Sequence, residues 1–153
     1  MADLDVQVAV GDDFDEMAVF DGLVFGEPWA EPQRALAKSM IDFDRFRVVR
    51  DGGRIVAVAG SYGIEVTVPG GAQVRTGGVT WVAVAATHRR RGILTRLMAE
   101  LHADLDRRRE PLAMLTASEG GIYERFGYGI ASYLRVTEID RRRTQVTAEY
   151  QPP

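Results

Sequence analysis

Hydrophobic and polar residues alternate over residues 4–10 and again over residues 131–139, a pattern that is typical of half-buried β-strands. Elsewhere the apolar positions recur every three or four residues, which is typical of amphipathic helices. The predicted strands cover residues 4–10, 46–49, 55–59, 63–68, 74–84, 112–115 and 131–139. The predicted helices run from a cap at Asp12 or Asp13 to about residue 24, from 31 to 41 and from 90 to 108, and a brief helix ends at Tyr123.

Glycine and proline mark the turns between these elements. Asp51-Gly52-Gly53 predicts a hairpin, Pro69-Gly70-Gly71 joins two further strands, and Pro111 ends the long helix. Thr116-Ala117-Ser118-Glu119 fits a capping box that opens the brief helix. The elements follow one another as strand, two helices, several antiparallel strands, long helix, strand, short helix and strand, without an internal repeat or a linker. This order predicts a single α/β domain over residues 1–153, with a mixed sheet.

Composition excludes several classes of protein. A chain of 153 residues with 46% hydrophobic and 27% charged residues suits one globular domain rather than a disordered or fibrous protein. The absence of cysteine excludes disulfides and thiolate metal sites, and two histidines, His88 and His102, are too few for a metal site of their own. No apolar run reaches about 18 residues, and the start of the chain lacks a signal-peptide pattern. We therefore expect no metal, no membrane association and a cytoplasmic location.

The positive charge of the chain is concentrated in arginine triplets. Lys38 is the only lysine among 19 basic residues, and the arginines include triplets at 89–91, 107–109 and 141–143. We interpret the second and third triplets as solvated surface. The net charge of −3 gives no general attraction to nucleic acid, so a nucleic-acid binder that uses the triplets is the least favoured function.

The first triplet differs because it follows a predicted buried strand and opens the long helix. A helix N-terminus carries unpaired N–H groups and a partial positive charge, so each cation there is disfavoured by roughly 0.3–1 kcal/mol. A bound polyanion would reverse this cost, and Gly92 would let phosphates approach the backbone closely. The segment lacks the patterns of a P-loop or a dinucleotide-binding loop. It predicts a phosphate or pyrophosphate site, with a solvated basic turn as the alternative.

Two segments carry a resemblance to a known family. Arg89-Arg90-Arg91-Gly92 after Val82-Ala83-Val84 resembles the acetyl-CoA motif of GCN5-related N-acetyltransferases (GNAT), Gln/Arg-x-x-Gly-x-Gly/Ala, although Leu94 stands where glycine or alanine is usual. The segments 82–92 and 117–129 are similar to the enhanced intracellular survival (Eis) acetyltransferases, and a looser similarity extends from about residue 6 to 139. The resemblance implies the GNAT acyl-CoA N-acyltransferase fold, with a mixed, mostly antiparallel sheet flanked by helices. Eis proteins are longer, and this chain corresponds to the first of their domains.

The resemblance also implies a role for individual residues. Val82, Ala83 and Val84 would present backbone groups to the acetyl and pantetheine part of acetyl-CoA, although a plain core strand is the alternative. The residues implied around the pyrophosphate are Arg89, Arg90, Arg91, Gly92, Ile93, Leu94 and Thr95. Ser118 and Glu119 would lie on the cofactor side, with helix capping as an alternative or additional role. Tyr123 would be the general acid that protonates the leaving thiolate, with a half-buried aromatic as the alternative.

These implications predict an acetyl-CoA-dependent N-acetyltransferase that acts on an amine, for which the resemblance suggests an aminoglycoside, a polyamine or a protein lysine. In Eis proteins the general base is the C-terminal carboxylate of the full-length chain, far beyond this segment. Asp21, Glu27 and Glu31 are the local carboxylates that could line the amine side and attract a cation. The alternative function is a non-catalytic CoA-binding module or an inactive truncated fragment. An exposed sheet edge would favour a homo-oligomer.

Overall fold

The computed structural model of the protein describes residues 4–117, 119–140 and 142. The chain divides into two compact units, residues 1–119 and residues 120–153. The first unit holds the sheet and the long helices, and the second holds Tyr123. The expectation of one domain over residues 1–153 stays a prediction.

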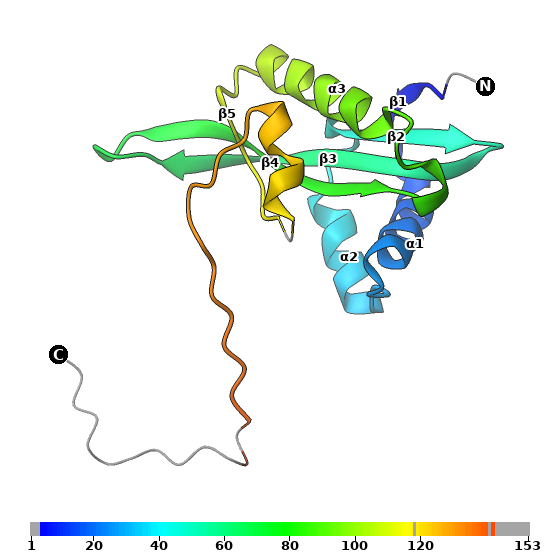
Figure 1. The fold of residues 1–153 in the computed structure, drawn as a ribbon, viewed down its shortest axis with the longest axis horizontal. Coiled ribbons are helices and arrows are strands. Elements are labelled where there is room, and N and C mark those ends of the chain that lie inside the picture. Colours follow the sequence, from blue (N-terminus) through cyan, green and yellow to red (C-terminus); the bar gives the residue numbers. More distant parts are fainter. Residues whose placement is uncertain (1–3, 118, 141, 143–153) are drawn as a thin grey trace. The chain divides into compact units, whose positions relative to one another are not determined.

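The first unit is built on one five-stranded sheet (Figure 1). Its strands are β1 (Val6–Val8), β2 (Phe46–Asp51), β3 (Arg54–Thr67), β4 (Gln73–Val84) and β5 (Leu112–Met114). They lie in the order β1-β2-β3-β4-β5; the first four are antiparallel, and β5 runs parallel to β4. Parallel neighbours need a crossover, which here contains the long helix after β4.

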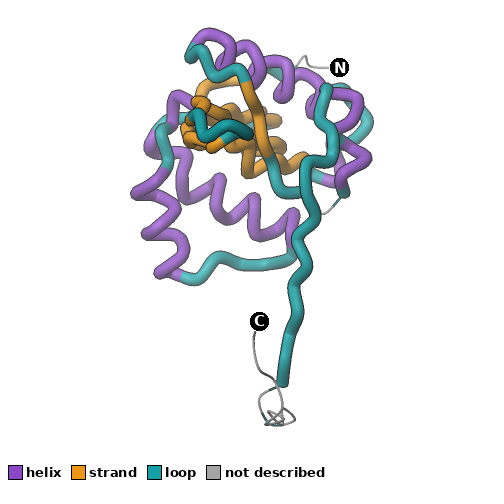
Figure 2. Tube along the Cα trace, turned by 90° about the vertical axis from the view of Figure 1, so that its left-hand side faces the viewer, coloured by secondary structure: helices purple, strands orange, loops and turns teal. Residues whose placement is uncertain are grey.

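Helices cover both faces of this sheet. They are α1 (Phe14–Phe25), α2 (Glu31–Met40) and α3 (Ile93–Arg107), and the single-turn 3₁₀ helices are Gly11–Asp13, Phe43–Arg45, Ala86–His88, Gly120–Ile122 and Glu124–Phe126. Figure 1 shows α3 on one face and α1 with α2 on the other, and the same layers are seen end-on in Figure 2. The predicted fold class, a mixed sheet flanked by helices, is confirmed. No helix in the described part of the chain is both long and apolar enough to cross a membrane.

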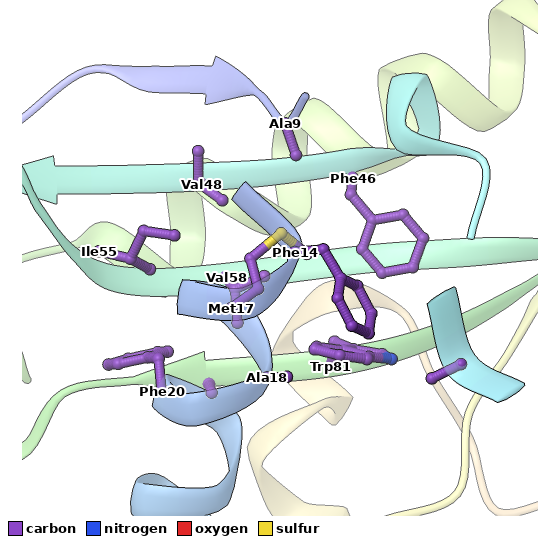
Figure 3. Packing of buried hydrophobic residues seen from close by; sticks show 12 residues of the cluster. Ala9, Phe14, Met17, Ala18, Phe20, Phe46, Val48, Ile55, Val58 and Trp81 are labelled. Atoms are coloured by element: carbon purple, nitrogen blue, oxygen red, sulfur yellow. The ribbon is translucent and has the colours of Figure 1, made fainter. Parts of the chain in front are cut away.

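The main core lies between the sheet and α1 and is centred on an aromatic cluster around Trp81 (Figure 3). The Trp81 ring lies 4.7 Å from Trp29, 6.1 Å from Phe46 and 6.3 Å from Phe14, measured between ring centroids. Burial of one such side chain contributes about 1.5–3 kcal/mol, so this cluster is a major part of the stability. Met17 packs beside it on α1. The core is therefore assembled on β4 directly before Val82.

A buried ion pair joins the segment after α3 to the start of β2. Both terminal guanidinium nitrogens of Arg45 donate to the Glu110 carboxylate, at 3.0 and 2.6 Å, and Arg45 Nε donates to the Ser61 carbonyl at 3.0 Å. Both charged side chains are buried. The bidentate geometry satisfies most of the hydrogen-bonding capacity of both groups, which makes their burial tolerable.

Two predicted elements differ from the structure within the first unit. The strands predicted at 55–59 and 63–68 are one strand, β3, because Gly60 is a point of close packing rather than a turn: a Cβ there would overlap the Phe46 ring. The long helix begins at Ile93 rather than at Arg90, because Arg90 and Gly92 have positive φ angles of 62° and 76° that an α-helix does not accept.

The end of the chain differs more. No strand forms over 131–139, since residues 129–140 contain neither helix nor strand and their apolar side chains are exposed. A strand requires a hydrogen-bonded neighbour, which alternation along one segment cannot supply. The brief helix predicted to end at Tyr123 is a 3₁₀ turn, Gly120–Ile122, and the predicted capping box includes Ser118, which lies outside the described residues.

Candidate active site

An open edge of β4 forms the first part of the candidate site. β5 pairs with β4 only along Thr76–Gly78, and no strand among the described residues pairs with the remainder of that edge. The Ala85 N–H donates to the Val56 carbonyl at 2.9 Å, which fixes the positions of β4 that face β3. By alternation Ala83 also faces β3, whereas Val82 and Val84 present their N–H and C=O groups to the open edge. An amide-containing ligand can therefore bind there as a strand would.

A β-bulge at Trp81 begins this open edge. Thr80 is opposite Gly60 and Ala83 is opposite Val58, so that β4 contains one extra residue at Trp81 and Val82. Trp81 has a φ of 54°, a left-handed conformation that costs an L-residue about 1–2 kcal/mol. The aromatic contacts of its side chain offset that cost. Backbone strain of this kind concentrates at functional sites, which is consistent with a binding role for the adjacent residues.

The arginine-glycine turn, residues 89–92, lies between β4 and α3. Its three arginines are exposed, and the left-handed Arg90 and Gly92 alternate with Arg89 and Arg91. The first helical hydrogen bond runs from the Arg96 N–H to the Gly92 carbonyl, at 3.1 Å. The N–H groups of Ile93, Leu94 and Thr95, in the first turn of α3, therefore have no partner within the helix. Such free N–H groups at a helix N-terminus form a concave site that suits a phosphate.

His88 connects this turn to the β2–β3 hairpin. Its Nε2 lies 3.0 Å from Asp51 Oδ2, and its Nδ1 lies 2.9 Å from Thr87 Oγ1. Its backbone N–H donates to the Ala85 carbonyl at 2.8 Å. With both ring nitrogens engaged, His88 holds the end of the 3₁₀ helix Ala86–His88 against the hairpin.

A cavity of about 700 Å³ opens on the face of the sheet that carries α1 and α2. Among its lining residues are Asp21, Phe25, Glu27, Trp29, Leu36 and Tyr62. Two of the three carboxylates suggested for the amine side, Asp21 and Glu27, thus lie in its wall, whereas Glu31 is not among the residues that line it. Because the Trp29 ring contacts Trp81, the wall of the cavity reaches the residue that precedes Val82.

Tyr123 belongs to the second unit, where it lies between two 3₁₀ turns. Its ring is half-buried and meets the Tyr128 ring edge-on, at 5.9 Å between centroids and 71° between planes. Burial raises the pKa of the Tyr123 phenol, and burial together with the neighbouring Tyr123 raises the pKa of Tyr128 to about 12. Tyr123 is therefore protonated near neutral pH, which is the state that a proton donor requires.

The remaining predicted site residues are placed as follows. Ile93 is buried, Leu94 is half-buried, and Thr95 is exposed in the first turn of α3. Glu119 is exposed at the end of the first unit, and Ser118 lies outside the described residues. In the part of the chain that the structure describes, no group of three or more His, Asp or Glu side chains is arranged to hold a metal ion.

Comparison with known proteins agrees with this geometry. The family model described as "Acetyltransferase (GNAT) domain" matches residues 5–131. The chain belongs to the GNAT acetyltransferase family. This GNAT domain is 43% identical over 123 residues to the N-acetyltransferase Eis of Mycobacterium tuberculosis, covering 77% of this chain and 31% of the relative.

Solved structures give the same result. The crystal structure of Eis1 from Mycobacterium abscessus aligns with a TM-score of 0.73 and 34% identity, over 83% of this GNAT domain and 31% of that chain. A predicted acetyltransferase from Clostridium acetobutylicum, solved with acetyl-CoA, shares the fold at a TM-score of 0.74 and 16% identity, over 88% and 96% of the two chains. This GNAT domain spans only about a third of the length of the Eis proteins it matches.

Gly92 offers a test of the arginine-glycine turn. Alanine at this left-handed position has room for its Cβ but is strained by its φ, so Gly92→Ala should destabilise this GNAT domain by about 1–2 kcal/mol and weaken CoA binding. Gly70→Ala, at a φ of 96° in the β3–β4 turn, is the matched control. It should cost similar stability and leave the affinity for CoA unchanged, as measured by urea unfolding and calorimetric titration. Equal affinity losses in both variants would contradict a specific role for the turn.

Proposed function

We propose that this domain binds acetyl-CoA and transfers its acetyl group to an amine. The observation that carries the proposal is the position of the arginine-glycine turn directly after the open edge of β4. Acetyl-CoA combines a chain of amides, which can pair with a strand edge, with a diphosphate, which suits free N–H groups at a helix N-terminus. The two features follow one another along the chain in the order that this ligand requires.

The roles of the individual residues follow from that arrangement. Val82 and Val84 would pair with the pantetheine amides, whereas the backbone of Ala83 is directed towards β3. The turn from Arg89 to Gly92, with the first residues of α3, would surround the diphosphate, where an anion removes the repulsion between the arginines and the helix dipole.

The chemical step is attack of a neutral amine on the thioester. A C–N bond forms, the C–S bond breaks, and the thiolate that leaves takes a proton from the Tyr123 phenol. The acetylated nitrogen loses one proton to solvent, and the Tyr123 phenolate regains one from solvent. The amine must first lose the proton that it carries near neutral pH, since alkyl amines have a pKa of about 10. The acidic cavity beside β4 supports an amine as the acceptor. Aminoglycosides, polyamines and protein lysines are the acceptors to test, because the Eis resemblance suggests them.

Cofactor binding is tested directly by thermal unfolding. Acetyl-CoA at about one hundred times its Kd should stabilise the chain by about 2.7 kcal/mol and raise Tm by about 5 °C or more. Arg90→Ser, which removes one charge from the turn, should reduce the shift, whereas Arg125→Ser in the second unit should leave it intact. Absence of any shift at millimolar acetyl-CoA would refute the proposed function.

Turnover is tested by release of free thiol from acetyl-CoA in the presence of each amine. Amine-dependent release by this chain would exclude the alternative of a non-catalytic CoA-binding module. A thermal shift without release from any amine would favour that alternative, in which the missing base belongs to the part of the longer relatives that this chain does not span. A homo-oligomer, a cytoplasmic location and the absence of nucleic-acid and membrane partners stay predictions from the sequence.

A further inference from the structure

A carboxylate in the wall of the α1–α2 cavity, that of Asp21, has one hydrogen-bond donor among the described residues. Asp21 lies on α1 and is 7% exposed. One of its oxygens, Oδ2, accepts a hydrogen bond of 2.9 Å from the indole N–H of Trp29. Among the described residues, no group donates to its other oxygen and no basic side chain forms an ion pair with it. That oxygen is not sealed from solvent, because Ser61 Oγ is the only buried side-chain atom without a partner in the part of the chain that the structure describes. It opens into the cavity and can accept a hydrogen bond from a ligand there.

The side chains around Asp21 favour a positively charged ligand in the cavity. Glu27 is a second acid in the wall of the cavity, and no basic residue is found among the described residues that line it. Trp29, Phe25 and Tyr62 contribute aromatic rings, whose faces attract cations. Burial raises the pKa of the Asp21 carboxyl, and the Trp29 hydrogen bond opposes that shift. A cation that enters the cavity would compensate the desolvation and favour the ionised form.

The indole rings of Trp29 and Trp81 lie between Asp21 and the open edge of β4, where we propose that the acetyl group binds. Asp21 reaches β4 through two indoles in series, since Trp29 donates to the carboxylate and packs against Trp81, the residue before Val82. A group held by Asp21 is therefore not the group that meets the thioester at the open edge. An acceptor that contacts both places needs two functional groups.

We propose that Asp21, fixed by Trp29, is a specificity-determining residue that binds an ammonium group of the acceptor other than the amine that is acetylated. This inference rests on the proposed function for its catalytic consequence. The ammonium supplies the donors that the free carboxylate oxygen lacks, and its charge balances the buried carboxylate. Trp29 holds the carboxylate in one orientation, so the distance from the bound ammonium to the open edge of β4 is fixed.

The binding experiment needs no acetyl-CoA. The chain contains two tryptophans, Trp29 and Trp81, which contact one another beside the cavity, so their fluorescence reports on its occupancy. Putrescine, with two ammonium groups, n-butylamine, with one, and neutral n-butanol are the probes. We expect both amines to change the fluorescence and n-butanol not to compete with them. Equal competition by n-butanol would overturn the proposal.

Asp21→Asn is the decisive variant, because the amide oxygen can still accept the Trp29 hydrogen bond while the charge is removed. It should weaken putrescine binding at least tenfold, measured by calorimetry as well as by fluorescence. Glu31→Gln is the matched control, since Glu31 is exposed and does not line the cavity, and it should bind putrescine within about twofold of the wild type. Equal putrescine affinity in wild type and Asp21→Asn would overturn the proposal.

Folding and catalysis supply the remaining readouts. Because burial raises the pKa of Asp21, ionisation costs stability as the pH rises through that raised value, so Asp21→Asn should be at least as stable as the wild type near neutral pH. In the thiol-release assay the variant should raise KM for putrescine more than KM for n-butylamine. Equal KM increases would contradict recognition of a second ammonium. Failure of the wild type to bind acetyl-CoA would refute the proposed function alone, since amine binding is measured without acetyl-CoA.

Discussion

Replacing Arg45 by alanine should lower the free energy of unfolding by about 3–5 kcal/mol, which is a large part of the stability of a domain of this size. The substitution leaves the Glu110 carboxylate buried without its bidentate partner and leaves the Ser61 carbonyl without the Arg45 Nε donor. The measurement is urea or thermal unfolding, with circular dichroism to confirm that the variant folds under native conditions.

An exposed ion pair provides the control for this prediction. Arg34 pairs with Asp15 at 2.6 Å, but the Asp15 side chain is 70% exposed, so Arg34→Ala should cost no more than about 1 kcal/mol. Replacing Arg45 and Glu110 together by methionine should restore most of the stability, because no charge is then left unpaired. Similar losses in Arg45→Ala and Arg34→Ala would show that the buried pair contributes little.

Replacing Tyr123 by phenylalanine should lower kcat about 10²- to 10⁴-fold, which is the usual contribution of a positioned general acid. The ring and its edge-on contact with Tyr128 are retained, and only the hydroxyl that donates the proton is lost. The affinity for acetyl-CoA should remain within about twofold of the wild type. Steady-state thiol release gives the rate, and calorimetric titration gives the affinity.

Tyr128→Phe is the control, because it removes a neighbouring hydroxyl from the same pair of rings. It should reduce kcat only slightly. Because burial raises the pKa of Tyr123 above the ordinary value of 10.0, the wild-type rate should not lose its acid component until the pH exceeds that value. Parallel losses of rate and of CoA affinity in Tyr123→Phe would instead assign the hydroxyl a structural role.

The elements with a clear local pattern were predictable from the sequence. The spacing of apolar residues located α1 and α2 almost to the residue, and the strand predicted at 74–84 after Pro69-Gly70-Gly71 matches β4. The break predicted at Gly60 was wrong because a sequence does not distinguish a glycine that makes a turn from one that leaves room for a neighbouring ring, here that of Phe46. The strand expected at 131–139 shows the opposite error, since alternation describes a face but does not provide a neighbouring strand.

The candidate site also has parts that the local sequence predicts and parts that depend on the folded chain. The arginine-glycine turn was predictable because its residues are adjacent, and their conflict with a helix N-terminus is a local matter. The open edge of β4 depends on where β5 stops pairing, and the ion pair of Arg45 with Glu110 joins residues 65 positions apart. Neither leaves a periodic signal. The carboxylates at 21 and 27 were recognisable as acids near a possible amine site, but burial of Asp21 against Trp29 could be learned only from the folded chain.

The backbone and the side chain of Trp81 have separate structural roles, and both limit which substitutions this position tolerates. Its backbone lies in the open edge of β4, where we propose that the cofactor binds, while its side chain occupies the centre of the core with Phe14 and Phe46. A glycine would relax the left-handed backbone but would empty the core, and another large residue would keep the volume but retain the strain. In a saturation mutagenesis screen, Trp81 should therefore tolerate substitution as poorly as residues of the proposed binding site, because the core and the backbone course of the open edge both depend on this residue.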